Sequence, residues 1–267
     1  HVGQGGKGAN QSLAMALAGG RVCHWGRLGR QDSWVRERMA DAGIDVSHIE
    51  LVDEPSGHAI IQVDDQGENA ILLYPGAIHG FTRQHWEQLS HTGRDGDWLL
   101  LQNECNGLPE LFHSAHARGL HIAFNPAPMS DSVLELPLEA CALLFVNRGE
   151  AAWLTGLAET SASEILLAGL LRRLPTTPTV LTLGAEGAWY QSADERHFQP
   201  AMPVQAVDTT GAGDTFIGYY LAALQEGQSV TRCLRLASQA AAIGIQRPGA
   251  ADSIPARQEV EARLNPQ

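Results

Sequence analysis

The chain has 267 residues, of which 18 are lysine or arginine and 30 are aspartate or glutamate, giving a formal net charge of −12. This charge repels the phosphates of nucleic acids and of anionic membranes, so neither is expected as a partner. The composition is 44% hydrophobic, yet no apolar run approaches the roughly 20 residues of a membrane-spanning helix, which predicts a globular protein without a membrane span.

The cysteines and the first residue bear on where the protein works. Cys23, Cys105, Cys141 and Cys233 lie far apart without paired spacing, as is typical of free thiols in a reducing compartment rather than of disulfides or a zinc site. We therefore expect a cytoplasmic protein. The chain starts at His1 with a glycine-rich segment and no preceding strand, so we expect a truncated N-terminus, and the absence of a signal peptide is not informative.

The first candidate site is the glycine-rich segment GQGGKGANQ at residues 3–11, which leads into a helical pattern. A Walker loop would need Ser or Thr after Lys7, and a dinucleotide fingerprint would need a preceding strand, so both are excluded. A flexible loop that presents Lys7 and Asn10 to a ligand remains possible. The alternative is a glycine-rich turn with a solvated lysine.

Residues 58–74 predict an antiparallel hairpin. HAIIQV and NAILLY flank the polar DDQGEN, and this connection is too short for a helix. No alternation of strands and helices surrounds the hairpin, so we expect it to stand outside the main sheet as a flap or as a small second layer. Flaps of this kind often cover active sites.

From about residue 95 short apolar runs alternate with helical stretches, which predicts parallel strands joined by crossover helices, an α/β fold. Apolar and polar residues do not alternate along these runs, as expected of strands that helices cover on both faces. Glu104, at the end of WLLLQNE, could accept hydrogen bonds from a hydroxylated ligand. His113 and His116 have helical spacing but no third metal ligand, which favours surface histidines.

Two further segments follow predicted strands. Asn147 and Glu150 have the spacing of a helix capping box; the functional alternative is that they hold a hydrated Mg²⁺ at the carboxyl end of a parallel strand. TLGAEG at 182–187 is another strand-to-turn segment at the same edge. LPTTPT at 174–179 is expected to join a helix to a strand.

The strongest segment is DTTGAGD at 208–214, a loop of small residues that is predicted to open directly into a helix. Gly211 and Gly213 let the backbone bend, and the first N–H groups of a helix lack internal partners, which predicts an anion site suited to phosphate. Asp214 could accept a proton from an attacking hydroxyl, or it could merely complement the helix dipole. The two glycines and Asp208 favour the functional interpretation. One apolar helix face is expected from Phe216, Ile217, Tyr220, Leu221 and Leu224.

Together these segments resemble the ribokinase family of sugar kinases, also called PfkB-type carbohydrate kinases. GGKGANQ (5–11) is similar to the sugar-binding signature of the family and DTTGAGDTF (208–216) to its catalytic signature. NPAP (125–128) and RPGAADSIP (247–255) occur in the family's order. The resemblance covers essentially the whole chain and implies one doubly wound, three-layer αβα domain over 1–267, with the hairpin at 58–74 as part of a β-sheet lid.

The resemblance also implies roles for individual residues. Asp214 would be the catalytic base. The other roles would be shared as follows: an anion hole of Gly211, Ala212 and Gly213; a sugar site of Gly6, Lys7, Asn10, Glu104 and Asp214; a nucleotide site of Asn147, Thr182, Gly184 and Gly187; a Mg²⁺ site, through water, of Asn147 and Glu150; and a monovalent-cation site of Asp208, Thr210, Gly244, Arg247, Gly249 and Ser253.

The implied activity is transfer of the γ-phosphate of ATP to the primary hydroxyl of a furanose such as D-ribose, with Mg²⁺, with K⁺ as activator, and in a homodimer formed through the lid. The alternatives are a nucleoside or ketose kinase of the same family, or a non-catalytic sugar-binding protein. The family begins with a strand carrying a sugar-binding Asp, and this chain starts after that point. Arg148 stands where an acidic residue is common, and Ile78 where Asn is usual.

Overall fold

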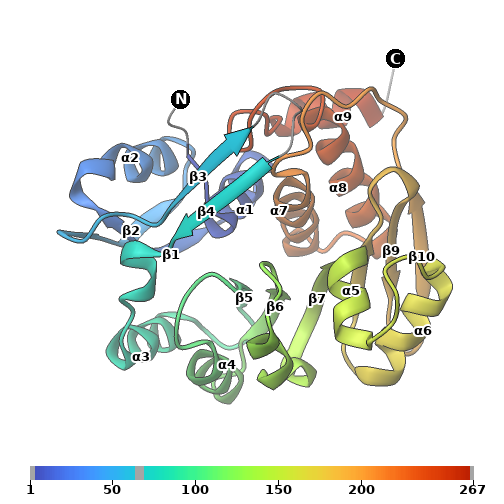
Figure 1. Ribbon diagram of the computed structural model, residues 1–267, viewed down its shortest axis with the longest axis horizontal. Coiled ribbons are helices and arrows are strands. Elements are labelled where there is room, and N and C mark those ends of the chain that lie inside the picture. The colour runs from blue at the N-terminus through green and yellow to red at the C-terminus, as the bar shows by residue number, and fades with distance from the viewer. Residues whose placement is uncertain (1–3, 64–68, 265–267) are drawn as a thin grey trace.

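The computed structural model describes residues 4–63 and 69–264, and its largest sheet has six strands in the order β10-β9-β8-β7-β6-β5 (Figure 1). Strands β5 to β8 run parallel, whereas β9 and β10 are antiparallel additions at one edge. The strands are β5 (Trp98–Gln102), β6 (His121–Asn125), β7 (Cys141–Asn147), β8 (Thr179–Thr182), β9 (Gly187–Gln191) and β10 (Arg196–Pro200).

Helices cover both faces of this sheet. The first face carries α1 (Lys7–Leu17), α7 (Ala212–Gln225), α8 (Val230–Gly244) and α9 (Arg257–Leu264). The second carries α3 (Arg83–Thr92), α4 (Leu108–Ala117), α5 (Arg148–Thr155) and α6 (Ser163–Arg173). The predicted connection at 174–179 joins α6 to β8, as expected.

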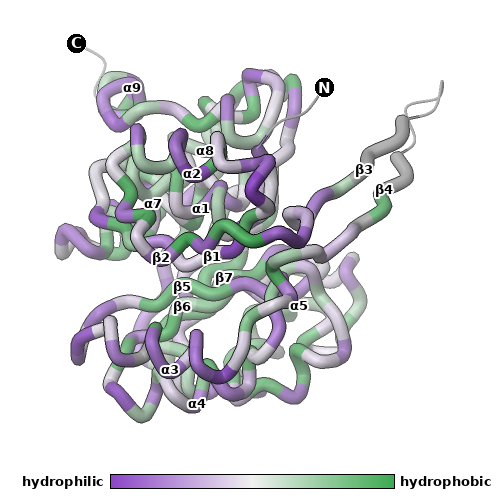
Figure 2. The backbone as a smooth tube through the Cα atoms, turned by 90° about the vertical axis from the view of Figure 1, so that its left-hand side faces the viewer, coloured by the Kyte–Doolittle hydropathy of each residue, from purple (hydrophilic) through white to green (hydrophobic). Residues whose placement is uncertain are grey.

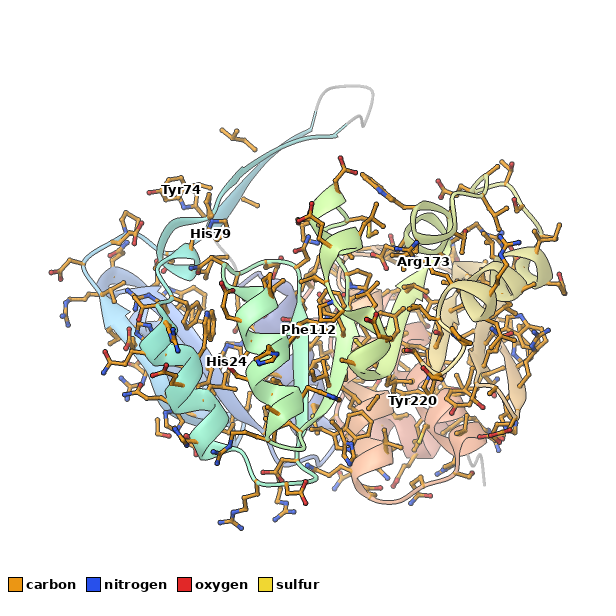
Figure 3. The ribbon with its side chains drawn as sticks, turned by 90° about the horizontal axis from the view of Figure 1, so that it is seen from below. His24, Tyr74, His79, Phe112, Arg173 and Tyr220 are labelled. Atoms are coloured by element: carbon orange, nitrogen blue, oxygen red, sulfur yellow. The ribbon has the colours of Figure 1, made fainter. Side chains whose placement is uncertain are left out.

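Alternate residues of each central strand enter two separate cores. In β7, Leu143 and Phe145 pack with α7 and α8, whereas Leu144 and Val146 pack with α4 and α6. Phe112 of the second core and Tyr220 of the first are both fully buried (Figure 3). A strand buried on both faces has no polar side, which is why its apolar run does not alternate. The predicted three-layer α/β fold is confirmed.

Two smaller sheets precede the main one. β3 (His58–Val63) and β4 (Asn69–Tyr74) form the predicted antiparallel hairpin, which projects from the body of the molecule (Figure 2). Residues 64–68 of its predicted turn lie outside the described residues. β1 (Cys23–Gly29) and β2 (Asp45–Val52) form a parallel pair connected through α2 (Ser33–Asp41), which the sequence analysis did not identify.

The environment of α7 differs from the prediction. We expected one apolar face, but every residue from Asp214 to Ala223 is buried, because α1 and α8 pack on either side of the helix and the sheet lies behind it. A Cβ atom added to Gly218 would lie 2.5 Å from the Cβ of Ala14. The backbones of α1 and α7 therefore lie in close contact at Gly218. The spacing of apolar residues along a helix does not reveal such a contact.

The remaining general expectations concern thiols and membranes. The four cysteines are free thiols, as predicted. In the described ranges, no helix combines the length and the apolar character needed to cross a bilayer.

Candidate active site

The carboxyl ends of the parallel strands align polar side chains along one edge of the sheet. Gln102 at the end of β5 is in register with Asn125 at the end of β6. Asn147 at the end of β7 is likewise in register with Thr182 at the end of β8. This is the edge at which open α/β sheets bind their ligands.

Helix α7 begins at this edge with an exposed set of backbone donors. Its N-cap Gly211 has φ 74°, a left-handed conformation that favours glycine. The N–H of Ala212 donates to the Thr209 carbonyl at 3.2 Å, whereas those of Gly211, Gly213 and Asp214 have no partner among the described residues. A Cβ added to Gly213 would meet nothing within 4 Å. These free donors and the open space beside them suit an anion.

Helix α1 meets α7 at the carboxylate of Asp214. Asn10 Nδ2 donates to Asp214 Oδ2 at 3.1 Å, and Gln11 Nε2 donates to Asp214 Oδ1 at 2.9 Å. All three side chains are buried. The two predicted signature loops, about 200 positions apart in the chain, are thus joined by direct hydrogen bonds.

Three residues of this network were not assigned a role from the sequence. Gln102 Nε2 donates to Gln11 Oε1 at 2.6 Å, and Gln11 Nε2 also reaches Asn125 Oδ1 at 3.4 Å. Asn125 in turn donates to the Phe145 carbonyl at 3.1 Å. Each of Gln102 and Asn125 ends an apolar strand, a signal that could have identified them. Gln11 lies in the quoted loop, but only the tertiary contact reveals its partner.

Glu104 and Lys7 also meet, through the backbone of Lys7. The Lys7 N–H donates to Glu104 Oε2 at 2.9 Å, so this carboxylate caps the N-terminus of α1. Burial raises the pKa of Glu104, and the hydrogen bond and charge of Lys7 oppose that shift. Glu104 therefore holds the start of the helix that follows the glycine-rich loop.

Three carboxyl groups share the field of the single lysine. Burial raises the pKa of Asp214, while hydrogen bonds from Gln11 and Asn10 and the charge of Lys7 lower it. Burial also raises the pKa of Glu150, which the charge of Lys7 again lowers. Lys7 therefore acts on the charge of Glu104, Glu150 and Asp214 alike, and the charge of Asp214 raises the pKa of both glutamates.

Asn147 and Glu150 form the capping box that their spacing predicts. Asn147 N–H donates to Glu150 Oε2 at 2.9 Å, and Glu150 N–H donates to Asn147 Oδ1 at 2.8 Å. The set offers carboxylate and amide oxygens, the donors that suit Mg²⁺ and its water shell. Nowhere in the described ranges do three His, Cys, Asp or Glu gather into a metal site. His113 and His116 are exposed, as expected.

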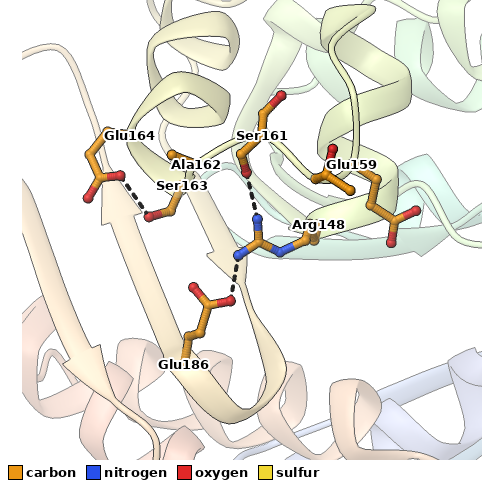
Figure 4. Close-up of a pocket in the computed structure, with 8 residues that line it drawn as sticks. Arg148, Glu159, Ser161, Ala162, Ser163, Glu164 and Glu186 are labelled. Atoms are coloured by element: carbon orange, nitrogen blue, oxygen red, sulfur yellow. Dashed lines mark hydrogen bonds and ion pairs between the residues drawn. The ribbon is translucent and has the colours of Figure 1, made fainter.

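The predicted nucleotide residues surround the turn after β8. Thr182 ends that strand, and Gly184 and Gly187 flank the short 3-10 turn Gly184–Glu186. Beside this turn lies an open pocket of about 750 Å³ between α5 and α6 (Figure 4). Arg148 spans it, donating to Glu186 Oε1 at 2.7 Å and to the Ser161 carbonyl at 2.8 Å. Arg148, which stands where an acidic residue is common in the family, is therefore held by Ser161 and Glu186.

The six residues of the predicted cation site come together behind the α7 loop. Asp208 accepts from Thr210 N–H at 2.9 Å and from Gly249 N–H at 2.8 Å, and hydrogen bonds from both residues, that of Thr210 first, lower its pKa. A Cβ added to Gly244 would lie 3.6 Å from the Ser253 carbonyl oxygen. Arg247 N–H donates to the Gly244 carbonyl at 3.0 Å. Carboxylate and carbonyl oxygens of the kind found here are hard donors, which is the ligand chemistry that a hard cation requires.

Comparison with known proteins identifies the carbohydrate-kinase family that the sequence motifs resemble, and the match covers nearly the whole chain. A profile of the "pfkB family carbohydrate kinase" matches residues 1–257. A ribokinase of Haemophilus influenzae is 34% identical over 267 residues, covering 97% of this chain and 86% of that protein.

Two solved structures are also similar. The ADP complex of ribokinase from Cryptococcus neoformans has a TM-score of 0.84 at 33% identity, covering 97% of this chain and 88% of that one. The complex of Arabidopsis thaliana ribokinase with ribose and ATP has a TM-score of 0.86 at 26% identity, covering 98% and 88%.

Proposed function

We propose, from the membership of this chain in the pfkB family of carbohydrate kinases, that its acceptor is D-ribose. Enzymes of this family are phosphotransferases that act on an alcohol group, and the group phosphorylated here would be the primary hydroxyl. The observation that carries the proposal is Asp214, buried between the N-termini of α1 and α7 and hydrogen-bonded to the predicted sugar loop. The ribose and ATP bound in the Arabidopsis thaliana relative support both substrates.

The chemistry follows from the position of Asp214. The carboxylate takes the proton of the primary hydroxyl as that oxygen attacks the γ-phosphorus, whose bond to the β,γ-bridging oxygen breaks so that ADP leaves. The raised pKa of Asp214 makes it a better base than a solvated carboxylate. The free N–H groups of Gly211 and Gly213 face the charge that builds up on the transferred phosphoryl group. Lys7, Asn10 and Glu104 hold the sugar.

We infer the ion sites that the resemblance implies. Asn147 and Glu150 would hold the water shell of Mg²⁺, which would neutralise phosphate charge. Asp208 and the backbone carbonyls around Gly244 and Gly249 would hold K⁺. Ala250 of the same segment would lie 3.0 Å from a Cβ on Gly211, so this cation site would adjoin the anion-binding turn.

We also propose a cytoplasmic homodimer in which the β3–β4 hairpin is both lid and dimer contact. Two large side chains of β4 are exposed, Leu72 at 66% and Tyr74 at 44%. Figure 3 shows Tyr74 at the base of the hairpin. Two large apolar side chains on a projecting hairpin favour burial against a second copy.

The test is ATP turnover by the protein against D-ribose, 2-deoxy-D-ribose, D-fructose and a nucleoside, with Mg²⁺ and with K⁺ or Na⁺. We expect the highest kcat/KM with D-ribose and stimulation by K⁺. A higher kcat/KM with a nucleoside or a ketose would replace D-ribose as the substrate, and equal rates in K⁺ and Na⁺ would remove the cation assignment.

The variant Asp214→Asn tests the base. We expect kcat to fall by roughly 10³-fold, because an amide cannot take the proton, while ATP binding measured by calorimetry stays unchanged. Near-normal turnover by this variant would show that another group is the base.

A further inference from the structure

One arginine side chain links three segments of the chain. Arg148 is the first residue of α5, and its guanidinium donates to Glu186 Oε1 at 2.7 Å and to the Ser161 carbonyl at 2.8 Å. Glu186 belongs to the turn after β8, and Ser161 lies in the connection between α5 and α6. The Arg148 side chain is only 24% exposed, so solvent and salt screen these bonds less than they screen a fully exposed pair.

The turn after β8 has few other restraints at its tip. Its base is closed by the Leu183 N–H, which donates to the Gly187 carbonyl at 2.8 Å. Gly184 carries no side chain, and a Cβ added there would meet nothing within 4 Å. Within the described ranges, the bond from Arg148 is the one side-chain hydrogen bond that residues 184–186 make. The tip therefore relies on Arg148 for its link to the rest of the molecule.

Packing does not replace this link. An open pocket of about 750 Å³ lies between the turn and the connection from α5 to α6, and Arg148 bridges it (Figure 4). Of the residues that line the pocket, all but Ala162 are polar or charged. At the strand ends Asn147 is in register with Thr182. The pair of Arg148 with Glu186 continues this connection beyond the sheet.

We propose that Arg148 is a positioning residue of the nucleotide site, which acts through Glu186 and holds the turn after β8 at a fixed distance from the start of α5. The inference rests on the proposed function, in which this turn binds ATP. Asn147 directly precedes Arg148, and Gly184 opens the turn, so one ion pair sets the spacing between the two proposed ATP-binding segments. Holding such segments in their binding geometry lowers the free-energy cost of binding.

Electrostatics alone predicts a different outcome. A carboxylate near the polyphosphate of ATP repels it, so replacing Glu186 by a neutral residue would strengthen ATP binding if Glu186 had no other role. If the carboxylate anchors Arg148 and thereby orders the turn, the same substitution weakens ATP binding. The sign of the effect at Glu186 therefore distinguishes positioning from charge repulsion.

The variants Glu186→Met and Arg148→Met test the inference by calorimetry with ATP and Mg²⁺ in the absence of sugar. We expect each to raise the Kd for ATP about three- to tenfold. The double variant should keep a raised Kd, within about twofold of that of Arg148→Met, because both substitutions remove one link. Glu186→Gln retains an acceptor oxygen for Arg148 and should have a Kd within about twofold of the wild type. In turnover assays the KM for D-ribose should change by less than about twofold.

Arg257→Met is the matched control. The Arg257 side chain is 22% exposed, and it likewise donates to a carboxylate, that of Glu226, and to a backbone carbonyl, that of Ala18. These contacts lie at the C-terminal ends of α7 and α1, away from the site. We expect the melting temperatures of Arg257→Met and Arg148→Met to fall by similar amounts, with the Kd for ATP raised in Arg148→Met alone.

A lower Kd for Glu186→Met, or an unchanged Kd for both single variants, would overturn the inference. A double variant whose affinity for ATP returns to that of the wild type would also overturn it, because charge repulsion would then explain the effect of Arg148→Met. Failure of the proposed acceptor is distinguishable, since the order of the Kd values then stays as expected while D-ribose is not phosphorylated. A wild type that binds no ATP would overturn both.

Discussion

Asp214 is oriented by neutral amides rather than by cations. Asn10 and Gln11 each donate to one carboxylate oxygen, and Gln102 in turn holds Gln11. Burial alone raises the pKa of a carboxyl group, so that it stays protonated up to a higher pH. The hydrogen bonds from Gln11 and Asn10 favour the ionised form of Asp214 and lower its pKa, which keeps the carboxylate available as a base. If Asp214 is the base that we propose, Gln11 is a positioning residue that acts through Asp214.

Gln11→Met should move the acidic limb of the pH–rate profile to higher pH. The reason is that Gln11 lowers the pKa of Asp214, a pKa that burial already raises, and the base must be ionised to act. We expect kcat at neutral pH to fall roughly tenfold and to recover partly at alkaline pH. The measurement is kcat against pH for wild type and variant. An unchanged acidic limb would mean that Gln11 has only a packing role.

At the scale of helices, the packing of α1 against α7 sets the position of Asn10 and Gln11 relative to Asp214. Each helix brings one signature loop to the sheet edge, and Gly218 lets them approach. An added Cβ there would also lie 2.6 Å from Met15 N and 2.7 Å from Gln11 O, which are backbone atoms that cannot rotate away. The distance between Gln11 and Asp214 thus depends on a glycine one turn further along α7.

Gly218→Ala should lower the free energy of unfolding by about 2–3 kcal/mol, because the two helices must separate. We expect kcat to fall as well, since Asn10 and Gln11 move away from Asp214. Thermal unfolding and steady-state kinetics measure the two effects. Ala14→Gly in the same chain removes the nearest contact and should restore part of both losses; simple additivity of the two substitutions would contradict this account.

At the scale of the whole molecule the hairpin is separate from the two cores. β3 and β4 pair only with each other in the described structure, and the hairpin projects from the body (Figure 2). Its exposed side chains contribute little to the stability of one chain. In the proposed homodimer these side chains would instead contribute to the contact with the second copy.

Leu72→Asp should therefore leave the melting temperature within about 2 °C of the wild type while halving the mass measured by light scattering. A charged side chain in the proposed dimer contact disrupts association. The substitution leaves the hydrophobic core of each chain intact, because Leu72 is not part of that core. Leu134→Asp, at another exposed leucine outside the hairpin, should leave the mass unchanged. If Leu72→Asp has the same mass as the wild type, the hairpin is not the contact.

Local patterns were sufficient to predict several features. Apolar runs without alternation indicated a sheet covered on both faces, and the small-residue loop before Asp214 indicated a helix start suited to an anion. The hairpin at 58–74 and the capping box of Asn147 and Glu150 also follow from neighbouring residues. In each case the physical cause acts over a few positions, so the sequence by itself determined the outcome.

Only the tertiary structure decided how these parts meet. Gln11 and Asp214 are 203 positions apart, and Glu104 caps a helix that begins 97 positions earlier. The β1–β2 pair and the burial of every side of α7 likewise depend on which elements pack together. Such contacts are set by the balance of burial, space and hydrogen bonding over the whole chain, and no local spacing encodes that balance.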